Sequence, residues 1–218
     1  MFTSPKPSST TRSALLVAVT AAAAAVVAFV APAAQAATCG SRTSSTPFSK
    51  FGDSNQYFLA PGGSFESGAG GWALQNGSVA AGNDTYSLNS AGDKQSLKLT
   101  GSATSGSFCI TRDDPLLRFA AKTVTTPGAN GNYSQLNVSI VVRNAAGSQA
   151  TFFLGVIPAQ GNGGWFISPQ LRYGNLLDSW LFGSDGTGTA TMQVQFTVAG
   201  QGGTWSIDDV FVDPFMGK

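Results

Sequence analysis

The strongest constraint on the fold is a series of short apolar or alternating segments separated by clusters of Gly, Asn, Ser and Asp. This spacing is typical of β-sandwiches and barrels, because the clusters supply turn residues and each segment spans one strand. The segments with this character are 56–60, 71–74, 96–100, 107–111, 116–122, 135–143, 149–157, 164–168, 190–198 and 205–212. The sequence therefore predicts an all-β, antiparallel fold.

Two of these segments alternate cleanly between apolar and polar residues, which predicts strands with one buried face. In 135–143, Leu136, Val138 and Ile140 alternate with polar Asn137 and Ser139. In 190–198 the alternation pairs a run of apolar residues with Gln193, Gln195 and Thr197. The turn residues 145–148 connect 135–143 to 149–157 and predict a hairpin.

One stretch, 169–182, lacks strand periodicity. Leucines at positions 171, 176, 177 and 181 lie near helical spacing. The stretch predicts either a short helix or a crossing loop.

The N-terminus has the composition of a signal peptide. Lys6 and Arg12 precede an apolar run over 14–30, and Pro32 and Ala34-Gln35-Ala36 follow it. Basic, apolar and small-residue regions in this order predict cleavage after residue 36, so the mature protein is expected to be secreted and extracellular. An uncleaved signal anchor is the alternative, because the run approaches the roughly 20 residues that cross a bilayer.

Removal of 1–36 leaves about 182 residues, a normal size for one domain. We expect a polar lead-in over 37–47 and a single domain over 48–218. Loss of Lys6 and Arg12 also changes the formal charge from +1 to about −1. Nucleic acid and anionic membrane surfaces select for basic patches, so neither is expected as a partner of the mature protein.

Cys39 and Cys109 are the two cysteines of the chain. In an oxidising compartment their default state is a single disulfide, which would tether the lead-in to the domain. Two separate thiols are the alternative.

Motifs near the two ends of the mature chain resemble those of a known family. Gly62–Gly68 reads GGSFESG and is followed by Gly71-Trp72-Ala73-Leu74 and Gly77, and Trp205–Val210 reads WSIDDV. Together they resemble the carbohydrate-binding modules of the galactose-binding-like jelly-roll fold. With 82–84, 115–119 and 213–215, the chain is also similar to uncharacterised secreted actinobacterial proteins. The resemblance implies a jelly-roll β-sandwich and a carbohydrate-binding role.

The resemblance also implies a structural calcium ion, because acidic residues from the first and last strands of such modules often hold one. The matching positions are Glu66, Asp208 and Asp209. Calcium takes six to eight oxygens, so backbone carbonyls near Gly63 and the side chain of Asn83 or Asp84 would have to contribute.

The carboxylate of Asp209 is expected to be buried, because Ile207 and Phe211 share its face of the strand. A buried carboxylate needs a partner. The alternatives to calcium are an arginine, backbone N–H groups, or a bulge that turns the side chain outward.

Aromatic rings are the candidate sugar platforms. Trp72 and Trp205 lie in strand-like segments and are expected in the core. The loop candidates for ligand binding are Trp165, Tyr173, Trp180, Tyr86 and Tyr133. Each is also compatible with ordinary packing, and two or more on one face would favour binding.

Catalytic systems that use an imidazole are excluded, because the chain has no histidine. A glycosidase pair of carboxylates is not excluded, although most aspartates occupy turns, where aspartate is common. The sequence therefore favours a secreted, non-catalytic protein that binds a polysaccharide or cell-envelope glycan. The first alternative is a structural or protein-interaction domain of the cell surface, and the second is a glycan-active enzyme.

Overall fold

The computed structural model describes residues 39–125, 134–161, 163–173, 178–183, 188–200 and 203–213. The chain divides into two units, Met1–Ala33 and Ala34–Lys218, and all described residues belong to the second unit. The predicted signal peptide and Tyr133 lie outside the described residues.

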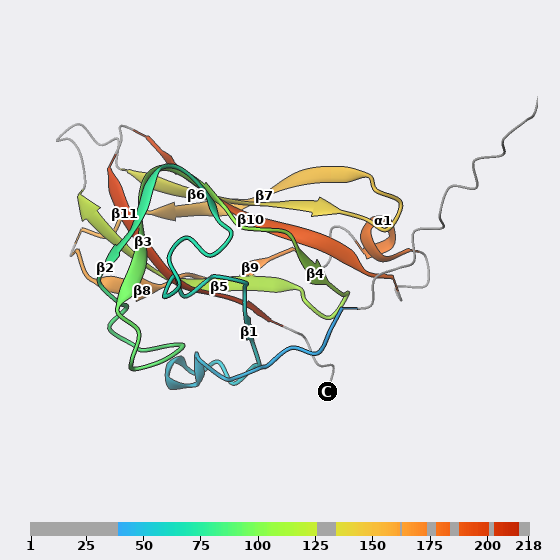
Figure 1. The fold of residues 1–218 in the computed structure, drawn as a ribbon, viewed down its shortest axis with the longest axis horizontal. Helices are drawn as coiled ribbons and strands as arrows, with labels where there is room; N and C mark the ends of the chain where they lie inside the picture. Colours follow the sequence, from blue (N-terminus) through green and yellow to red (C-terminus); the bar gives the residue numbers. More distant parts are fainter. Residues whose placement is uncertain are drawn as a thin grey trace, which may run out of the picture. The chain divides into compact units, whose positions relative to one another are not determined.

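The described chain is almost entirely β-structure (Figure 1). A short 3-10 helix, η1 (Ser49–Phe51), and one helix, α1 (Asp178–Phe182), accompany the strands. The strands are β1 (Phe58–Leu59), β2 (Ala73–Ala81), β3 (Gln95–Thr104), β4 (Phe108–Ile110), β5 (Leu116–Thr125), β6 (Gln135–Arg143), β7 (Gln149–Pro158), β8 (Trp165–Ile167), β9 (Leu171–Arg172), β10 (Ala190–Ala199) and β11 (Thr204–Asp213).

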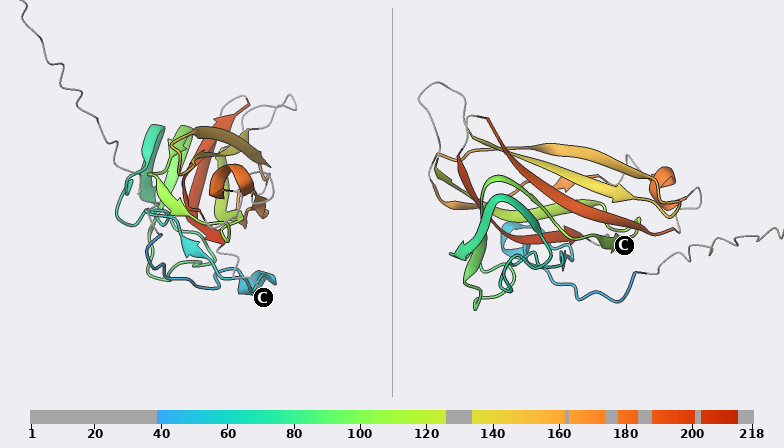
Figure 2. Two further views of the ribbon diagram at one scale, coloured as in Figure 1. Left: turned by 90° about the vertical axis from the view of Figure 1, so that its right-hand side faces the viewer. Right: turned by 45° about the horizontal axis from the view of Figure 1, so that its top comes forward.

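All strand pairs are antiparallel, and the main sheet has the order β7-β6-β10-β3-β11-β5-β8. Outside this order, β1 pairs with β11, β2 with β3, β4 with β10 and β9 with β5. The sheet curls so that β6, β7 and β10 form one layer and β5, β8 and β11 the other (Figure 2). The fold is the predicted all-β, antiparallel jelly-roll sandwich.

The core lies between the layers and follows the predicted alternation. Leu136, Val138, Ile140 and Val142 of β6 are fully buried. The partner strand β10 contributes its own apolar residues to the same cluster. Side chains of β6 that face the other way are only half-buried or exposed, so the alternation of the sequence fixes which side of this layer faces solvent.

Trp72 and Trp205 belong to this core, as predicted. Trp72 stacks on Phe196 with ring centroids 5.8 Å apart, and Trp205 is fully buried. The indole Nε1–H of Trp205 donates to Ser134 Oγ at 2.8 Å. Both rings are therefore occupied by packing and not presented to a ligand.

The hairpin predicted at 145–148 connects β6 to β7. Gly147 adopts φ 84°, a left-handed conformation that glycine enters without steric cost. Within 169–182 the structure has both a strand, β9, and the short helix α1, so the predicted helix occupies only the end of that stretch.

Strand β2 is longer than predicted, because it continues through Gln75, Asn76, Gly77 and Ser78 to Ala81. These polar residues carry no apolar pattern, but their backbone pairs with β3 around a register shift between Gln75 and Gly77. Backbone pairing requires no particular side chain, so the pattern could not reveal it.

A disulfide joins Cys39 to Cys109 of β4, with Cα atoms 5.4 Å apart. Residues 39–47, which we call the strap, are also held by Arg42, whose Nη1 lies 2.7 Å from Asp114 Oδ2. An isolated antiparallel β-bridge between Ser45 and Tyr57 fixes the far end of the strap. Over the described residues, no helix has the length and apolar character needed to cross a membrane.

Candidate functional site

The solvent side of the layer formed by β6, β7 and β10 is a polar sheet face, which we call the outer face. Cross-strand registers place Gln195 beside Ser139, and Gln193 beside Val141. Residues facing the same way on β2 and β3 continue the rows. The outer face consists of Gln75, Ser102, Thr104, Asn137, Ser139, Val141, Arg143, Gln149, Thr151, Phe153, Val156, Thr191, Gln193, Gln195 and Thr197.

Amides and hydroxyls dominate this face, and Arg143 is the single charged residue among those fifteen. Some of the amides are fixed by neighbours: Gln195 Nε2 donates to Thr104 Oγ1 at 3.3 Å, and Gln193 Nε2 donates to Ser105 O at 2.9 Å. Each fixed amide keeps its carbonyl oxygen as an acceptor. The face therefore offers oriented neutral hydrogen-bonding groups.

One large ring stands on the outer face. Phe153 of β7 is 61% exposed and lies opposite Ser139 in the register. Val156, also on β7, is 42% exposed. A large exposed apolar side chain amid polar groups is typical of a contact surface.

The outer face is hollowed at one end. A depression of about 140 Å³ lies between β6, β7, β10 and Ser107, the residue before β4. Its lining residues are Ser107, Val141, Val142, Arg143, Gln149, Thr191 and Gln193. The guanidinium of Arg143 is oriented there by Gln149 Oε1, which accepts from Nη2 at 2.7 Å.

Four of the loop aromatics predicted as sugar platforms lie among the described residues, and two of these, Tyr86 and Trp165, lie together. Tyr173 is 3% exposed and packs in the core, so its ring is not available to a ligand. Trp165 and Tyr86 are half-buried in a second cluster, where Tyr86 Oη donates to Trp165 O at 2.6 Å. Trp180 keeps 38% of its surface exposed and packs edge to face on Phe152, with ring centroids 6.2 Å apart.

Sequence reasoning missed Phe153 and the glutamines of β10 as site candidates. Their signal was the polar half of the alternation, which marks residues on the solvent side of a strand. Whether those residues gather on one surface depends on the pairing of β7, β6 and β10, which the tertiary structure supplies.

The adjacent carboxylates of Asp208 and Asp209 are both fully buried in β11. Asp208 Oδ2 accepts from the backbone N–H of Asp84 at 3.0 Å, and Asp209 Oδ2 accepts from that of Asn89 at 2.9 Å. A register shift in β11 and φ 48° at Asp209 mark a bulge, but the side chain stays inside. The burial expected for Asp209 is confirmed.

Burial raises the pKa of both groups. The pKa of Asp208 rises to about 9 because of burial first and the neighbouring charge of Asp209 second. That of Asp209 rises to about 8 through burial, offset by the Asn89 amide and reinforced by a side-chain hydrogen bond with Asp84. Two buried oxygen atoms, Asp209 Oδ1 and Asn83 Oδ1, have no hydrogen-bond partner among the described residues.

Buried oxygen atoms without a hydrogen-bond partner suit a hard cation such as calcium. Glu66, the third predicted ligand, uses Oε1 to accept from the backbone N–H groups of Lys94 and Gln95 at 2.8 and 2.6 Å. Across the described residues, His, Cys, Asp and Glu side chains form no group of three or more suited to hold a metal. Asp209 Oδ1 and Asn83 Oδ1 are oxygen donors of the type that calcium takes, but they are two of the six to eight that it needs, and Oε1 of Glu66 is bound to backbone amides.

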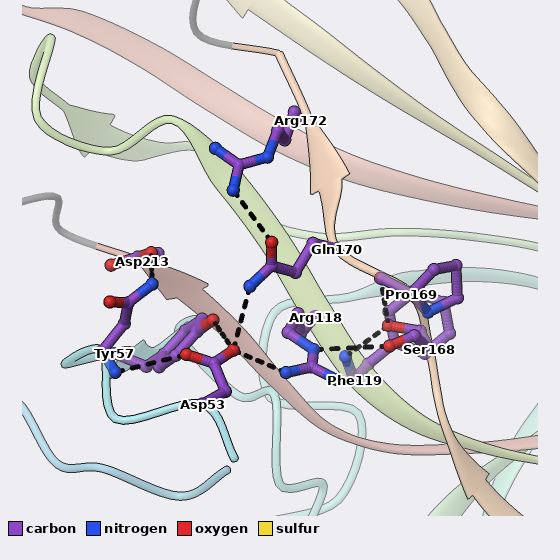
Figure 3. A network of polar contacts seen from close by, with 10 residues as sticks. Asp53, Tyr57, Arg118, Phe119, Ser168, Pro169, Gln170, Arg172 and Asp213 are labelled. Carbon is purple, nitrogen blue, oxygen red and sulfur yellow. Dashed lines mark hydrogen bonds and ion pairs between the residues drawn. The ribbon is translucent and has the colours of Figure 1, made fainter. Parts of the chain in front are cut away.

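A second polar network surrounds Asp53, whose carboxylate lies to the left in Figure 3, where the dashed lines from Tyr57, Gln170 and Arg118 meet. It accepts from Tyr57 Oη at 2.6 Å, from Gln170 Nε2 at 3.1 Å and from Arg118. Burial acts to raise the pKa of Asp53, but the hydrogen bonds outweigh it and the pKa lies below its ordinary value. The donors surround this carboxylate, so the network fastens the segment before β1 to β5.

The close approach of the GGSFESG turn to β11 explains one of its glycines. A Cβ atom on Gly63 would lie 2.9 Å from the carbonyl oxygens of both Ala60 and Val210. Gly63 and Val210 also exchange a backbone hydrogen bond of 3.0 Å from Val210 N to Gly63 O. The two motifs that were far apart in the sequence therefore lie side by side.

No protein-family model matches the chain, and no curated protein matches it. Solved structures with a similar fold include several carbohydrate-binding modules and the enzymatically active domain of a bacteriophage tailspike protein. One, a family 61 module in complex with β-1,4-galactotriose, is 14% identical with a TM-score of 0.40, covering 72% of this chain and 97% of that chain. A family 22 module of Clostridium thermocellum Xyn10B is 16% identical with a TM-score of 0.39, covering 70% and 92%.

A third, a family 28 module specific for non-crystalline cellulose, is 13% identical with a TM-score of 0.44 and covers 71% of this chain and 94% of that chain. Such similarities concern the path of the chain. They carry no information about the side chains on the outer face of this protein.

Proposed function

We propose that this is a secreted, non-catalytic protein that binds a neutral polysaccharide or cell-envelope glycan on the outer face. The observation that carries the proposal is the combination of Phe153, 61% exposed, with rows of amides and hydroxyls on three neighbouring strands. The predicted signal peptide supports the extracellular location.

The chemistry of the outer face matches that of a sugar chain. A pyranose ring has one apolar face of C–H groups, which packs against an aromatic ring, and a rim of hydroxyls that need both donors and acceptors. Gln193, Gln195 and Asn137 supply both kinds of group without charge. An open sheet face also leaves room for a chain to extend beyond one ring, which a closed pocket would not.

Phe153→Ala is the sharpest test of this site. Binding to a panel of insoluble and soluble polysaccharides is measured by pull-down and by affinity electrophoresis. We expect the variant to bind about five- to thirtyfold more weakly than the wild type, because an aromatic platform contributes on the order of 1–2 kcal/mol. The fold should survive, since the ring lies on the surface.

Phe51→Ala is the matched control, because Phe51 is also an exposed phenylalanine, 42% exposed, on η1 away from the outer face. It should bind polysaccharide as the wild type does. Equal losses in both variants, or a folded wild type that binds no glycan, would contradict the proposal. Concentration-dependent self-association abolished by Phe153→Ala would support the protein-interaction alternative in its place.

A structural calcium ion is part of the same proposal. Asp209 and Asn83 would hold it through their buried oxygens without partners, and Asp208 lies beside them. The ion would neutralise carboxylates that burial otherwise keeps protonated. It would stabilise β11 and the adjoining loop without contacting the outer face.

Metal analysis and thermal melts test the ion directly. We expect about one calcium per chain and a melting temperature several degrees lower in chelator, because removal of a bound ligand lowers stability. Asp209→Asn should melt at the same temperature with and without chelator. Absence of bound metal together with unchanged melting in chelator would rule the site out, and would leave the glycan proposal intact.

A further inference from the structure

The depression at one end of the outer face is small and presents polar side chains. Its volume of about 140 Å³ is below that of most small-molecule sites, which are usually about 300–1,000 Å³, so a run of several sugar rings does not fit inside it. A larger cavity of about 410 Å³ lies between the strap and the sheet, but the rings of Phe58 and Phe108 in its walls are only 5% and 8% exposed. In the depression, by contrast, Arg143, Gln149 and Ser107 are exposed to solvent.

Arg143 is held in a fixed orientation at the edge of the depression. Its Nη2 donates to Gln149 Oε1 at 2.7 Å, and its Nη1 donates to Gly147 O at 3.1 Å. A guanidinium has five N–H donors in one planar fork, so these two bonds orient the group and leave further donors for a ligand. Two parallel N–H groups of such a fork can bond to two adjacent oxygen atoms.

Hydroxyl and amide groups lie beside this fork. Thr191 of β10 is opposite Arg143 in the register, and Gln193 follows it on the same face. Gln193 Nε2 donates to Ser105 O at 2.9 Å, which leaves Oε1 as an acceptor, and the hydroxyls of Thr191 and Ser107 both donate and accept. A sugar ring that enters the depression therefore exchanges its hydrogen bonds to water for bonds to the protein.

The depression lies where the outer face ends. Arg143 is the last residue of β6, Gln149 is the first of β7 and Thr191 is the second of β10. Phe153 is four residues along β7 from Gln149, a separation of about 13 Å at a rise of about 3.3 Å per residue. This separation exceeds the length of one sugar ring, so Phe153 and the depression would contact different rings of one chain.

We propose that the depression is a subsite for the terminal sugar of a neutral glycan, so that the protein recognises chain ends. This role rests on the proposed function, because Phe153 would support an inner ring of the same chain. A terminal ring is linked on one side only, so it can sink into a hollow with its free hydroxyls toward the walls. An inner ring is held at the level of the chain by linkages on both sides. The fork of Arg143 would bind two adjacent hydroxyls of the terminal ring.

The number of chain ends at constant mass tests the subsite without any variant. A linear soluble polysaccharide that the wild type binds is shortened by partial hydrolysis, and the number of binding sites per gram is measured by isothermal titration calorimetry at each chain length. We expect this number to rise in proportion to the number of chain ends. A number of sites per gram that stays constant as the chain ends multiply would show binding along the chain and would overturn the proposal.

Ser107→Trp locates the subsite, because Ser107 is an exposed lining residue whose replacement would fill the depression with a large ring. It should bind the shortened chains at least about tenfold more weakly than the wild type. Ser44→Trp is the matched control, since Ser44 is exposed on the strap and outside the lining. It should bind as the wild type does, and equal affinity of Ser107→Trp and the wild type would rule the subsite out.

Arg143→Gln and Arg143→Lys test the fork, because lysine keeps the charge and loses the planar pair of donors. With a neutral terminal sugar, both variants should bind the shortened chains about tenfold more weakly. Arg172→Gln, at an exposed arginine of β9, should bind as the wild type does. Full binding by Arg143→Lys together with weak binding by Arg143→Gln would show that only the charge acts, and would overturn the assignment to a neutral sugar.

Phe153→Ala distinguishes failure of this subsite from failure of the glycan site. If Phe153→Ala weakens binding but Ser107→Trp does not, and the number of sites per gram is independent of chain length, the outer face binds glycan along the chain and only the chain-end subsite is ruled out. A folded wild type that binds no glycan would contradict both.

Discussion

Asp213 is a single residue whose burial changes its titration. It lies at the end of β11, 2% exposed, and its Oδ2 accepts from Asn55 Nδ2 at 3.1 Å. Burial first, and then the charge of Asp53, raise the pKa of Asp213 from 3.8 to about 6. The folded state therefore holds a proton that the unfolded state releases between pH 3.8 and about 6.

The sign of the resulting pH dependence follows from this difference. The contribution of Asp213 to stability is fully present below pH 3.8 and is lost as the pH rises through about 6. Asp213→Asn removes the ionisation, so we expect it to raise the free energy of unfolding at pH 8 by about 1–2 kcal/mol.

Urea unfolding at pH 4 and pH 8 measures the effect. The exposed Asp113→Asn serves as control and should change stability little at either pH. A stabilisation by Asp213→Asn that is as large at pH 4 as at pH 8 would show that titration is not the cause.

At the scale of the element, the strap illustrates how tertiary contacts hold a segment that has no regular structure. The strap is attached to the rest of the domain by the disulfide, the Arg42–Asp114 ion pair and the β-bridge between Ser45 and Tyr57. The segment contributes one wall of the cavity beside Phe58 but no residue to the outer face.

Replacing both Cys39 and Cys109 by serine should therefore affect stability more than glycan binding. The disulfide spans 70 residues, and closing a loop of that length corresponds to about 4 kcal/mol, with smaller values often measured. We expect a loss of about 2–4 kcal/mol in the free energy of unfolding.

Chemical denaturation of the double variant checks the loss of stability, and a polysaccharide pull-down checks that binding is kept. The wild type treated with a reductant is the matched control and should behave like the variant. Loss of polysaccharide binding in a variant that remains folded would contradict the placement of the glycan site on the outer face.

The whole molecule has little net charge after removal of the predicted signal peptide, about −1, and its outer face contains one charged residue. Screening by salt affects only interactions between charges. A neutral glycan should therefore bind with a dissociation constant that changes less than about twofold between roughly 50 and 500 mM NaCl.

Affinity electrophoresis at several salt concentrations measures this, with Arg143→Gln as the comparison variant. If binding weakens more than about tenfold across that range, and Arg143→Gln removes the salt dependence, the ligand is an anionic glycan. Expression of the full chain in an exporting host, with N-terminal sequencing of protein from the medium, checks the predicted cleavage before Ala37.

Much of the fold was predictable because one strand face is apolar and the other polar. The alternation in β6 and β10 identified which residues are buried, and Trp72 and Trp205 were correctly expected in the core. The full length of β2 was not predictable, since its pairing uses backbone groups that leave no pattern in the side chains.

The candidate site was less predictable than the fold. Tyr173 occupies a stretch that resembles a loop, but three-dimensional packing buries it to 3% exposure. Phe153 follows a partly buried phenylalanine on β7, and only the register with Ser139 shows that its ring stands on the outer face.

The sequence by itself determined the class of fold, the buried faces of its strands and the residues available for chemistry. These depend on short-range periodicity and on side-chain type, which are local properties of the chain. The tertiary structure decided which polar residues share a surface, which aromatics are exposed and where the strap encloses a cavity. Those depend on contacts between residues far apart in the chain, and no local pattern encodes which strands become neighbours.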